Sequence, residues 1–229
     1  MTIKQNLIII KEKIEKSKHS ADQNVDIIAV TKTHPPSVIK ECYEAGIRSI
    51  GENKIQEAEE KFKAHNNMPG LTKRFIGHLQ SNKVNKCLDL FDSIDSIDTY
   101  KLSRKINNRA KLLNKKITIL LEVNTSKEQQ KHGFLQGDID KMIECFEFTN
   151  LKIQGLMTIA HAGKNEKELR KSFTMLREIK ENLNRQKPTG CNELTELSMG
   201  MSNDFGIAIE EGSTQVRIGT ALLGRRQNQ

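Results

Sequence analysis

One lysine of this 229-residue chain stands where its amine could become nucleophilic. Lys32 closely follows the apolar run 27–30, which has the composition of a buried strand. Desolvation beside such a strand lowers the pKa of an ammonium group, and the freed amine can form a Schiff base with an aldehyde. An ordinary ion pair, for example with Glu52, is the alternative, and the position of Lys32 alone leaves both interpretations open.

A second group of residues could bind a phosphate. The run 197–202 carries the hydroxyls of Ser198 and Ser202 around a glycine, and Gly219 and Thr220 follow the next strand pattern. Barrel enzymes commonly build a phosphate site from the loops after their last two strands, where backbone amides approach the ligand closely. A glycine-containing turn capped by Ser202 is the simpler alternative for the first run.

Arg217 lies between two strand-forming apolar residues. If its side chain points inward, the guanidinium needs an acceptor, because a buried unpaired charge is very costly. A ring nitrogen or a carboxylate would serve. An outward arginine that touches a covering helix is the alternative.

The elements that would position these residues alternate between short β-branched runs and longer helical patterns. Helices are expected between the strands, and a further amphipathic helix at 3–16 precedes the series. Eight strands joined by helices imply parallel pairing and match the number that closes a (β/α)8 barrel. An open doubly wound sheet is the competing fold. The expected strands are 26–30, 49–51, 75–77, 93–94, 117–123, 153–158, 194–198 and 215–218.

In a barrel, the carboxyl ends of the strands form the functional rim, and the polar residues of this chain gather there. No composition break marks a linker, so residues 1–229 are expected to form a single domain. Besides the groups above, the polar residues that follow the expected strands are Asn53, His78, Gln80, Asn82, Asn124 and His161.

Composition and charge exclude several classes of protein. The chain has 37 basic and 29 acidic residues, but lysines are spread over nearly every segment and there are only two tyrosines and no tryptophan. We therefore expect a basic solvated surface and no nucleic-acid site. A nucleic-acid-binding protein, which the net charge of +8 would fit, is the alternative. The four cysteines and the six histidines show no metal-ligand spacing, so no metal site is expected. Without a signal peptide or a long apolar run, the protein is expected to be cytoplasmic and to span no membrane.

Several motifs together resemble the pyridoxal phosphate homeostasis protein family, which consists of small barrels akin to the N-terminal domain of alanine racemase. The resemblance covers residues 26–224, with the motifs in family order. It implies a fold-type III barrel that binds pyridoxal 5′-phosphate (PLP). The motifs are Ala-Val-Thr-Lys-Thr at 29–33, Gly-Glu-Asn at 51–53, Phe-Ile-Gly-His-Leu-Gln-Ser-Asn-Lys at 75–83, Gly-Leu-Met at 155–157, Leu-Ser-Met-Gly-Met-Ser-Asn-Asp at 197–204, Gly-Ser-Thr at 212–214 and Val-Arg-Ile-Gly-Thr at 216–220.

The resemblance also implies residue roles. Lys32 corresponds to the lysine that carries PLP as a Schiff base, and Arg217 to the arginine that faces the pyridine nitrogen. Asn53 and Met157 correspond to residues beside the cofactor. His78 and Asn82 belong to the family motif but receive no role. The implied phosphate-side residues are Ser198, Met199, Ser202, Gly219 and Thr220.

Binding without strong catalysis is the expected function. PLP enzymes use the protonated pyridine ring to stabilise a carbanion, and an arginine cannot give up a proton to that ring. The chain ends soon after Thr220, which leaves no room for the second domain and partner group that a racemase uses. We expect a monomeric carrier or regulator of PLP that serves apo-enzymes in vitamin B6 homeostasis. A PLP-dependent racemase or lyase is the alternative.

Overall fold

The computed structural model of the chain describes residues 1–64, 68–126, 128, 131–160 and 165–224.

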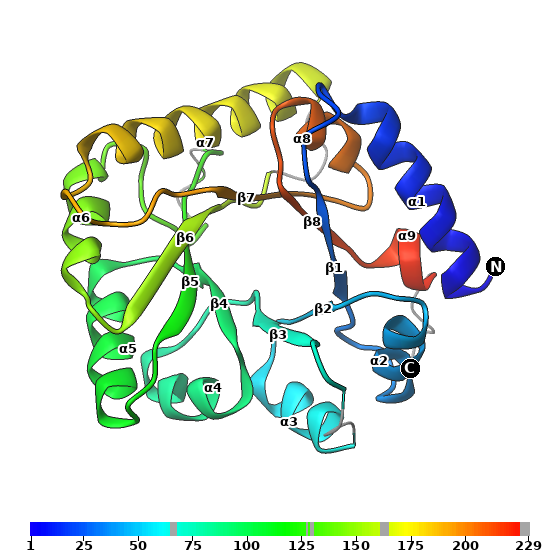
Figure 1. Cartoon of the computed structure of the whole chain (residues 1–229), viewed down its shortest axis with the longest axis horizontal. Helices are drawn as coiled ribbons and strands as arrows, with labels where there is room; N and C mark the ends of the chain where they lie inside the picture. Colours follow the sequence, from blue (N-terminus) through cyan, green and yellow to red (C-terminus); the bar gives the residue numbers. More distant parts are fainter. Residues whose placement is uncertain (65–67, 127, 129–130, 161–164, 225–229) are drawn as a thin grey trace.

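Within these residues, eight parallel strands close into a barrel in sequence order (Figure 1). Helices follow the strands and form an outer ring, so the predicted (β/α)8 barrel is confirmed and the open doubly wound sheet is excluded. The strands are β1 Asp26–Val30, β2 Ser49–Glu52, β3 Thr72–Phe75, β4 Ser93–Ile97, β5 Ile117–Glu122, β6 Leu151–Met157, β7 Glu196–Met201 and β8 Gln215–Ile218.

The helical ring has one extra member at the N-terminus, as the sequence predicts. This helix, α1, packs along α8 and α9 on the outside of the barrel (Figure 1). Thr2 and Gln5 start α1 with a reciprocal capping box. The described helices are α1 Ile3–Ser17, α2 Ser37–Glu44, α3 Ile55–Lys63, η1 Ser81–Lys83, α4 Val84–Leu90, α5 Tyr100–Leu112, α6 Ile139–Glu144, η2 Cys145–Glu147, α7 Glu166–Gln186, α8 Phe205–Glu210 and α9 Thr220–Leu223.

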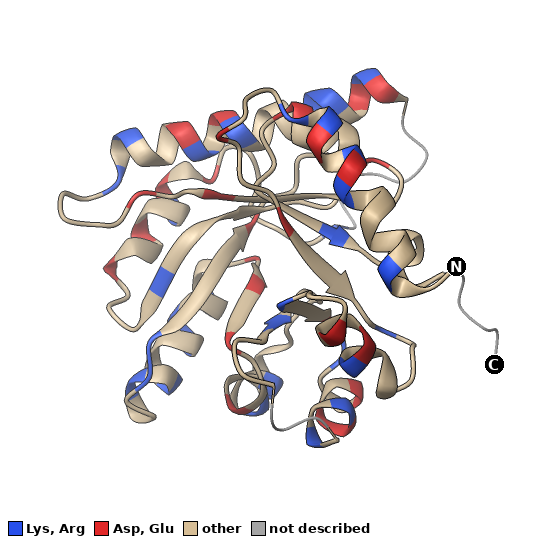
Figure 2. Cartoon of the chain, turned by 45° about the vertical axis from the view of Figure 1, so that its right-hand side comes forward, with Lys and Arg blue, Asp and Glu red and all other residues tan. Residues whose placement is uncertain are grey.

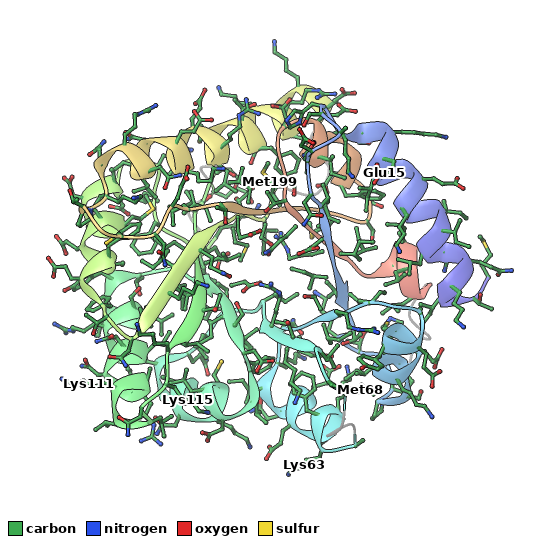
Figure 3. The ribbon with its side chains drawn as sticks, in the orientation of Figure 1. Glu15, Lys63, Met68, Lys111, Lys115 and Met199 are labelled. Atoms are coloured by element: carbon green, nitrogen blue, oxygen red, sulfur yellow. The ribbon has the colours of Figure 1, made fainter. Side chains whose placement is uncertain are left out.

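The core lies between the barrel wall and the helices. Every residue of β4 is buried, and α7 turns one apolar stripe toward the strands. Met199, labelled in Figure 3, is fully buried in β7, whereas the labelled Lys63 and Lys111 stand at the periphery. This division explains why charged residues dominate the helices and apolar residues the strands.

The pairing of β1 with β8 closes the barrel. Ile28 lies opposite Arg217, and Ala29 lies opposite Ile218. Because all strands run in parallel, this pairing places the carboxyl ends of the first and last strands side by side on one rim.

Most strand boundaries differ from the sequence prediction by one to three residues, and two strands are shifted. The strand expected at 75–77 is Thr72–Phe75, and the strand expected at 194–198 is Glu196–Met201. The short helix α9, Thr220–Leu223, was not predicted. A search for apolar runs misses β3, because most of this strand is polar: Thr72, Lys73 and Arg74.

Charged residues of both signs alternate along the outer helices in Figure 2. This pattern agrees with the expected solvated surface. No helix in the described part of the chain has the length and apolar character needed to cross a bilayer. The cysteines are all free thiols, and Cys42, Cys87 and Cys145 are buried.

A substitution at Gly155 tests whether the barrel depends on the close approach of β6 to β7. A Cβ at this position would lie 1.9 Å from the carbonyl oxygen of Glu196, so Gly155→Ala must push the two strands apart. We expect the free energy of unfolding to fall by about 3 kcal/mol. Gly137, where a Cβ meets nothing within 4 Å, is the control, and Gly137→Ala is expected to change stability by less than about 0.5 kcal/mol. Urea unfolding measures both, and equal stabilities of the two variants would contradict the expectation.

Candidate functional site

A cavity of about 720 Å³ opens at the carboxyl ends of the barrel strands. Its size is typical of a site for a small molecule or cofactor. The structure brings six of the nine predicted site residues to the wall of this cavity. They are Lys32, Asn53, Ser202, Arg217, Gly219 and Thr220.

The loop that carries Lys32 is held by a buried ionic cluster beneath it. Lys61 of α3 donates hydrogen bonds of 2.7 Å to the carbonyl of Thr31 and to the carboxylates of Glu52 and Glu57. The hydroxyl of Thr31 donates to the same oxygen of Glu52 at 2.6 Å. The carboxylate that the sequence offered as a partner for Lys32 therefore binds Lys61 and Thr31. Successive side chains of an extended strand point to opposite faces, so Thr31 faces the helix layer while Lys32 lines the cavity.

Thr33, the residue that follows Lys32, is also held by the ionic cluster. Its φ is 65°, in the left-handed region that a β-branched residue rarely adopts, and its amide donates to the carboxylate of Glu57. Such strain persists only where surrounding contacts enforce it, and it is concentrated at functional sites. The ionic cluster thus holds both neighbours of Lys32 and leaves its side chain at the cavity.

Asn53 follows β2 and meets the loop after β3. A Cβ on Gly77 would lie 2.3 Å from the Asn53 carbonyl, so only glycine permits this approach. The side-chain Oδ1 of Asn53 is buried and has no hydrogen-bond partner among the described residues. A buried acceptor of this kind on a cavity wall suits a ligand that donates a hydrogen bond.

Arg217 is only 5% exposed, and its guanidinium lies in the wall of the cavity. It donates to the carbonyl and the hydroxyl of Ser198, at 2.7 and 2.9 Å, and to the carbonyl of Thr158 at 2.7 Å. Burial lowers the pKa of this guanidinium, and the nearby carboxylates of Glu122, Asp95 and Asp204 oppose that shift. The arginine is therefore inward, as the first of the two sequence interpretations proposed, and its acceptors are backbone carbonyls and a hydroxyl.

Three predicted residues lie in the barrel wall and are absent from the cavity lining. Ser198 and Met199 belong to β7, not to a loop after it, because this strand continues to Met201. Ser198 contacts Arg217, while Met199 is fully buried. Met157 ends β6 and is also fully buried.

The segments after β7 and β8 meet at Ser202. Its hydroxyl accepts hydrogen bonds of 3.2 Å from the amides of Gly219 and Ala221. Gly219 and Thr220 form the turn into α9, so they follow β8 as predicted, although the helix itself was missed. The hydroxyl side chains of Ser202 and Thr220 and the backbone of Gly219 therefore gather on one part of the cavity wall.

Glu122 is the main residue that the sequence analysis missed. It ends β5, is 7% exposed and lines the cavity. Burial, followed by repulsion from Asp98, raises its pKa to about 7, and Arg217 opposes the shift. The available signal was a charged residue at the carboxyl end of a buried strand. It was missed because the expected strand, 117–123, placed Glu122 inside the strand and not at its end.

Two further motif residues received no role from the sequence. His78 follows β3, lines the cavity and contacts Asp98. Asn82 lies in η1, is exposed and does not line the cavity. His161 lies outside the described residues.

Comparison with known proteins identifies the family. A family model described as the N-terminal domain of alanine racemase matches residues 5–227. A pyridoxal phosphate homeostasis protein of Aquifex aeolicus (strain VF5) is 37% identical over 227 residues, which cover 97% of this chain and 98% of that protein. The chain belongs to the pyridoxal phosphate homeostasis protein family. The mouse protein of the same name is 36% identical over 214 residues, covering 87% of this chain and 76% of that protein.

Solved structures share this fold. PipY of Synechococcus elongatus PCC7942 superimposes with a TM-score of 0.89 in its structure without PLP, at 35% identity over 97% of this chain and 100% of that one. Its structure with PLP bound gives 0.86 at 33% identity, with the same coverage. An alanine racemase of Clostridium difficile 630 shares the fold alone, with a TM-score of 0.77, 16% identity and coverage of 96% of this chain and 57% of that one.

Glu122 predicts how stability depends on pH. Its pKa is about 7 in the folded protein, above the ordinary value of 4.5, so the folded state binds this proton more tightly than the unfolded state. The stability that comes from this proton is complete below about pH 4.5 and is lost as the pH rises through about 7. Glu122→Gln cannot titrate. Its free energy of unfolding relative to wild type should therefore rise by up to about 3 kcal/mol between about pH 5 and about pH 8.

Urea unfolding at a series of pH values measures this difference. Glu44→Gln removes an exposed carboxylate of α2 and is the matched control, with a profile parallel to that of wild type. Parallel profiles for wild type and Glu122→Gln would show that Glu122 keeps an ordinary pKa.

Proposed function

We propose that this protein binds PLP in the cavity at the barrel rim, with the aldehyde held as a Schiff base on Lys32. It acts in intracellular vitamin B6 homeostasis as a carrier or regulator of the cofactor. The observation that carries the proposal is the convergence of Lys32, Arg217 and the Ser202–Gly219 contact on one cavity. The relatives named for PLP homeostasis, and PipY with PLP bound, support the identity of the ligand.

The residues present fit each part of PLP. The amine of Lys32 suits the aldehyde, which it binds with loss of water. The hydroxyls of Ser202 and Thr220 are donors suited to a phosphate. The amides of Gly219 and Ala221 donate to the Ser202 hydroxyl in this structure, and they would become phosphate donors where a phosphate oxygen takes the place of that hydroxyl. Ser198, Met199 and Met157 would support these contacts from within the barrel wall. The buried acceptor of Asn53 on the cavity wall could take a hydrogen bond from the hydroxyl group of the ring.

Arg217 determines what the bound cofactor can do. PLP, when protonated at its ring nitrogen, accepts electrons from a reacting amino acid. A guanidinium stays charged and can only donate a hydrogen bond to an unprotonated nitrogen. Because the backbone carbonyls of Ser198 and Thr158 fix Arg217, this contact favours binding and weakens catalysis.

A PLP-dependent racemase or lyase remains the second candidate function, and Glu122 is the observation that favours it. A carboxyl group with a pKa of about 7 in the cavity wall could donate or accept a proton near neutral pH. The two tyrosines do not supply such a group: Tyr43 donates to the carbonyl of Pro69, and Tyr100 packs against Phe148.

Borohydride reduction tests the anchor. After incubation with PLP, reduction should leave a phosphopyridoxyl group on Lys32, located by peptide mass spectrometry, and Lys32→Ala should lose both the visible absorbance and the label. Lys131 lines the same cavity, so Lys131→Ala is the matched control and should keep both. A label that stays in Lys32→Ala, or a wild-type protein that takes none, would refute the assignment.

Turnover of amino acids separates the two candidate functions. For each L- and D-amino acid tested, we expect the loaded protein to react no faster than free PLP, because Arg217 keeps the ring nitrogen unprotonated. Chiral chromatography and a keto-acid assay measure racemisation and elimination. Turnover well above the rate with free PLP, lost in both Lys32→Ala and Glu122→Gln, would establish an enzyme instead.

A further inference from the structure

We propose that His78, Asp98 and His132 form a binding site for a divalent transition-metal ion such as Zn²⁺ on the wall of the same cavity. The proposal goes beyond PLP binding and does not depend on it. No metal site was expected from the sequence, because the three residues come from three separate loops.

Barrel topology brings the three residues together. His78 follows β3, Asp98 directly follows β4, and His132 lies in the segment after β5. Strands β3, β4 and β5 are neighbours in the closed barrel, so the loops after them share one sector of the rim.

Hydrogen bonds hold these loops in place. The hydroxyl of Ser96 donates to the carbonyl of Gly77 at 2.5 Å, which ties the end of β4 to the residue before His78. Near His132, the amide of Asn124 donates to the carbonyl of Phe134 at 2.9 Å. The amide of Phe134 in turn donates to the carbonyl of Glu122 at 2.8 Å. These bonds hold the chain next to His78 and Asp98 and the segment that follows His132.

The ligand atoms already lie near one another. Oδ2 of Asp98 is 3.0 Å from Nδ1 of His78 and 3.8 Å from Nδ1 of His132. One possible ligand atom from each residue lies within 4.8 Å of the other two. In a tetrahedral site with bonds of roughly 2.0–2.2 Å, ligand atoms are separated by about 3.3 Å. Small side-chain movements would bring the three atoms to this spacing.

The donor set selects the class of metal. Two imidazoles and one carboxylate resemble the three protein ligands of many zinc sites that keep a fourth position open. Mg²⁺ and Ca²⁺ prefer oxygen ligands only, so they should bind poorly here. Asp98 is 7% exposed, which holds the anionic ligand in a weakly screened environment.

The two imidazole rings must tilt when the metal binds. They are stacked with centroids 3.6 Å apart and an interplanar angle of 10°, so their lone pairs run side by side instead of converging on one point. The side chains of His78 and His132 are 42% and 55% exposed, which leaves them room to turn, while Asp98 stays fixed. Metal binding should therefore break the stack and leave the carboxylate in place.

The open coordination position would face the cavity, because His78 and His132 both line it. Strands β3 to β5 lie across the barrel from β7 and β8, whose loops carry Ser202 and Gly219. A metal here would leave the predicted phosphate side free. Its open position could accept water or the carboxylate of a second small molecule.

Cobalt binding tests the proposal, since Co²⁺ replaces Zn²⁺ and absorbs visible light. The protein is prepared without a histidine tag and stripped of metal. It carries Lys32→Ala, so that PLP adds no colour, and Cys191→Ser, because Cys191 is the one cysteine that is not buried. We expect a saturable band with one equivalent of Co²⁺, displaced by Zn²⁺ but not by Mg²⁺.

Single substitutions assign the ligands. His78→Ala, His132→Ala and Asp98→Asn should each weaken Co²⁺ binding about tenfold or more, since loss of even an outer-shell partner costs about 10–100-fold. His19→Ala removes an exposed histidine that lines a different pocket, and this variant should bind as the parent does. Absence of a saturable band in the parent, or equal affinity in the parent and in a His78→Ala/His132→Ala double variant, would overturn the proposal. The two histidine variants alter exposed side chains, so their folding is not at risk if Asp98→Asn proves unstable.

Discussion

The pairing of β1 with β8 is the constraint on which the site depends. It places Ile28 opposite Arg217 and thereby brings the first and last strands of the chain to one rim. Because every strand runs the same way, all eight carboxyl ends meet there, and residues from distant segments can line one cavity. An open sheet with the same strands would separate Lys32 from Arg217. Closure of the barrel therefore brings polar residues from distant parts of the sequence to one cavity.

Two buried charged groups support this rim from outside and inside the barrel. Lys61 joins Glu52, Glu57 and the carbonyl of Thr31 on the helix side, and this cluster fixes the loop of Lys32. Inside, Arg217 takes the carbonyls of Ser198 and Thr158 as acceptors. Removing Glu52 from its buried ion pair with Lys61 would cost about 3–5 kcal/mol, because it leaves a buried charge without that partner. The geometry of the site is therefore maintained by the same contacts that stabilise the fold.

Local patterns in the sequence were sufficient for much of the fold. β1 and β8 match the expected ranges 26–30 and 215–218, because each is a short β-branched run with clear ends. β3 was misplaced because most of its residues are polar, and α9 is too short for helical periodicity to reveal. The candidate site followed a similar rule: six of the nine residues expected from contiguous motifs line the cavity, whereas pairing between strands created the neighbourhoods of Glu122 and of the His78–Asp98–His132 group. A single sequence does not show which loops face one another.

The structure also explains why binding and weak catalysis would go together in the proposed function. The backbone carbonyls of Ser198 in β7 and of Thr158, directly after β6, hold the guanidinium of Arg217. A change in its position would therefore require a change in the barrel wall. A donor fixed in this way would bind an unprotonated ring nitrogen. The same contact that holds the ring would keep it a poor acceptor of electrons. The charges of Glu122 and Arg217 interact, and Glu122 could transfer a proton near neutral pH. It would not change the protonation of the ring nitrogen that Arg217 faces in the proposed function.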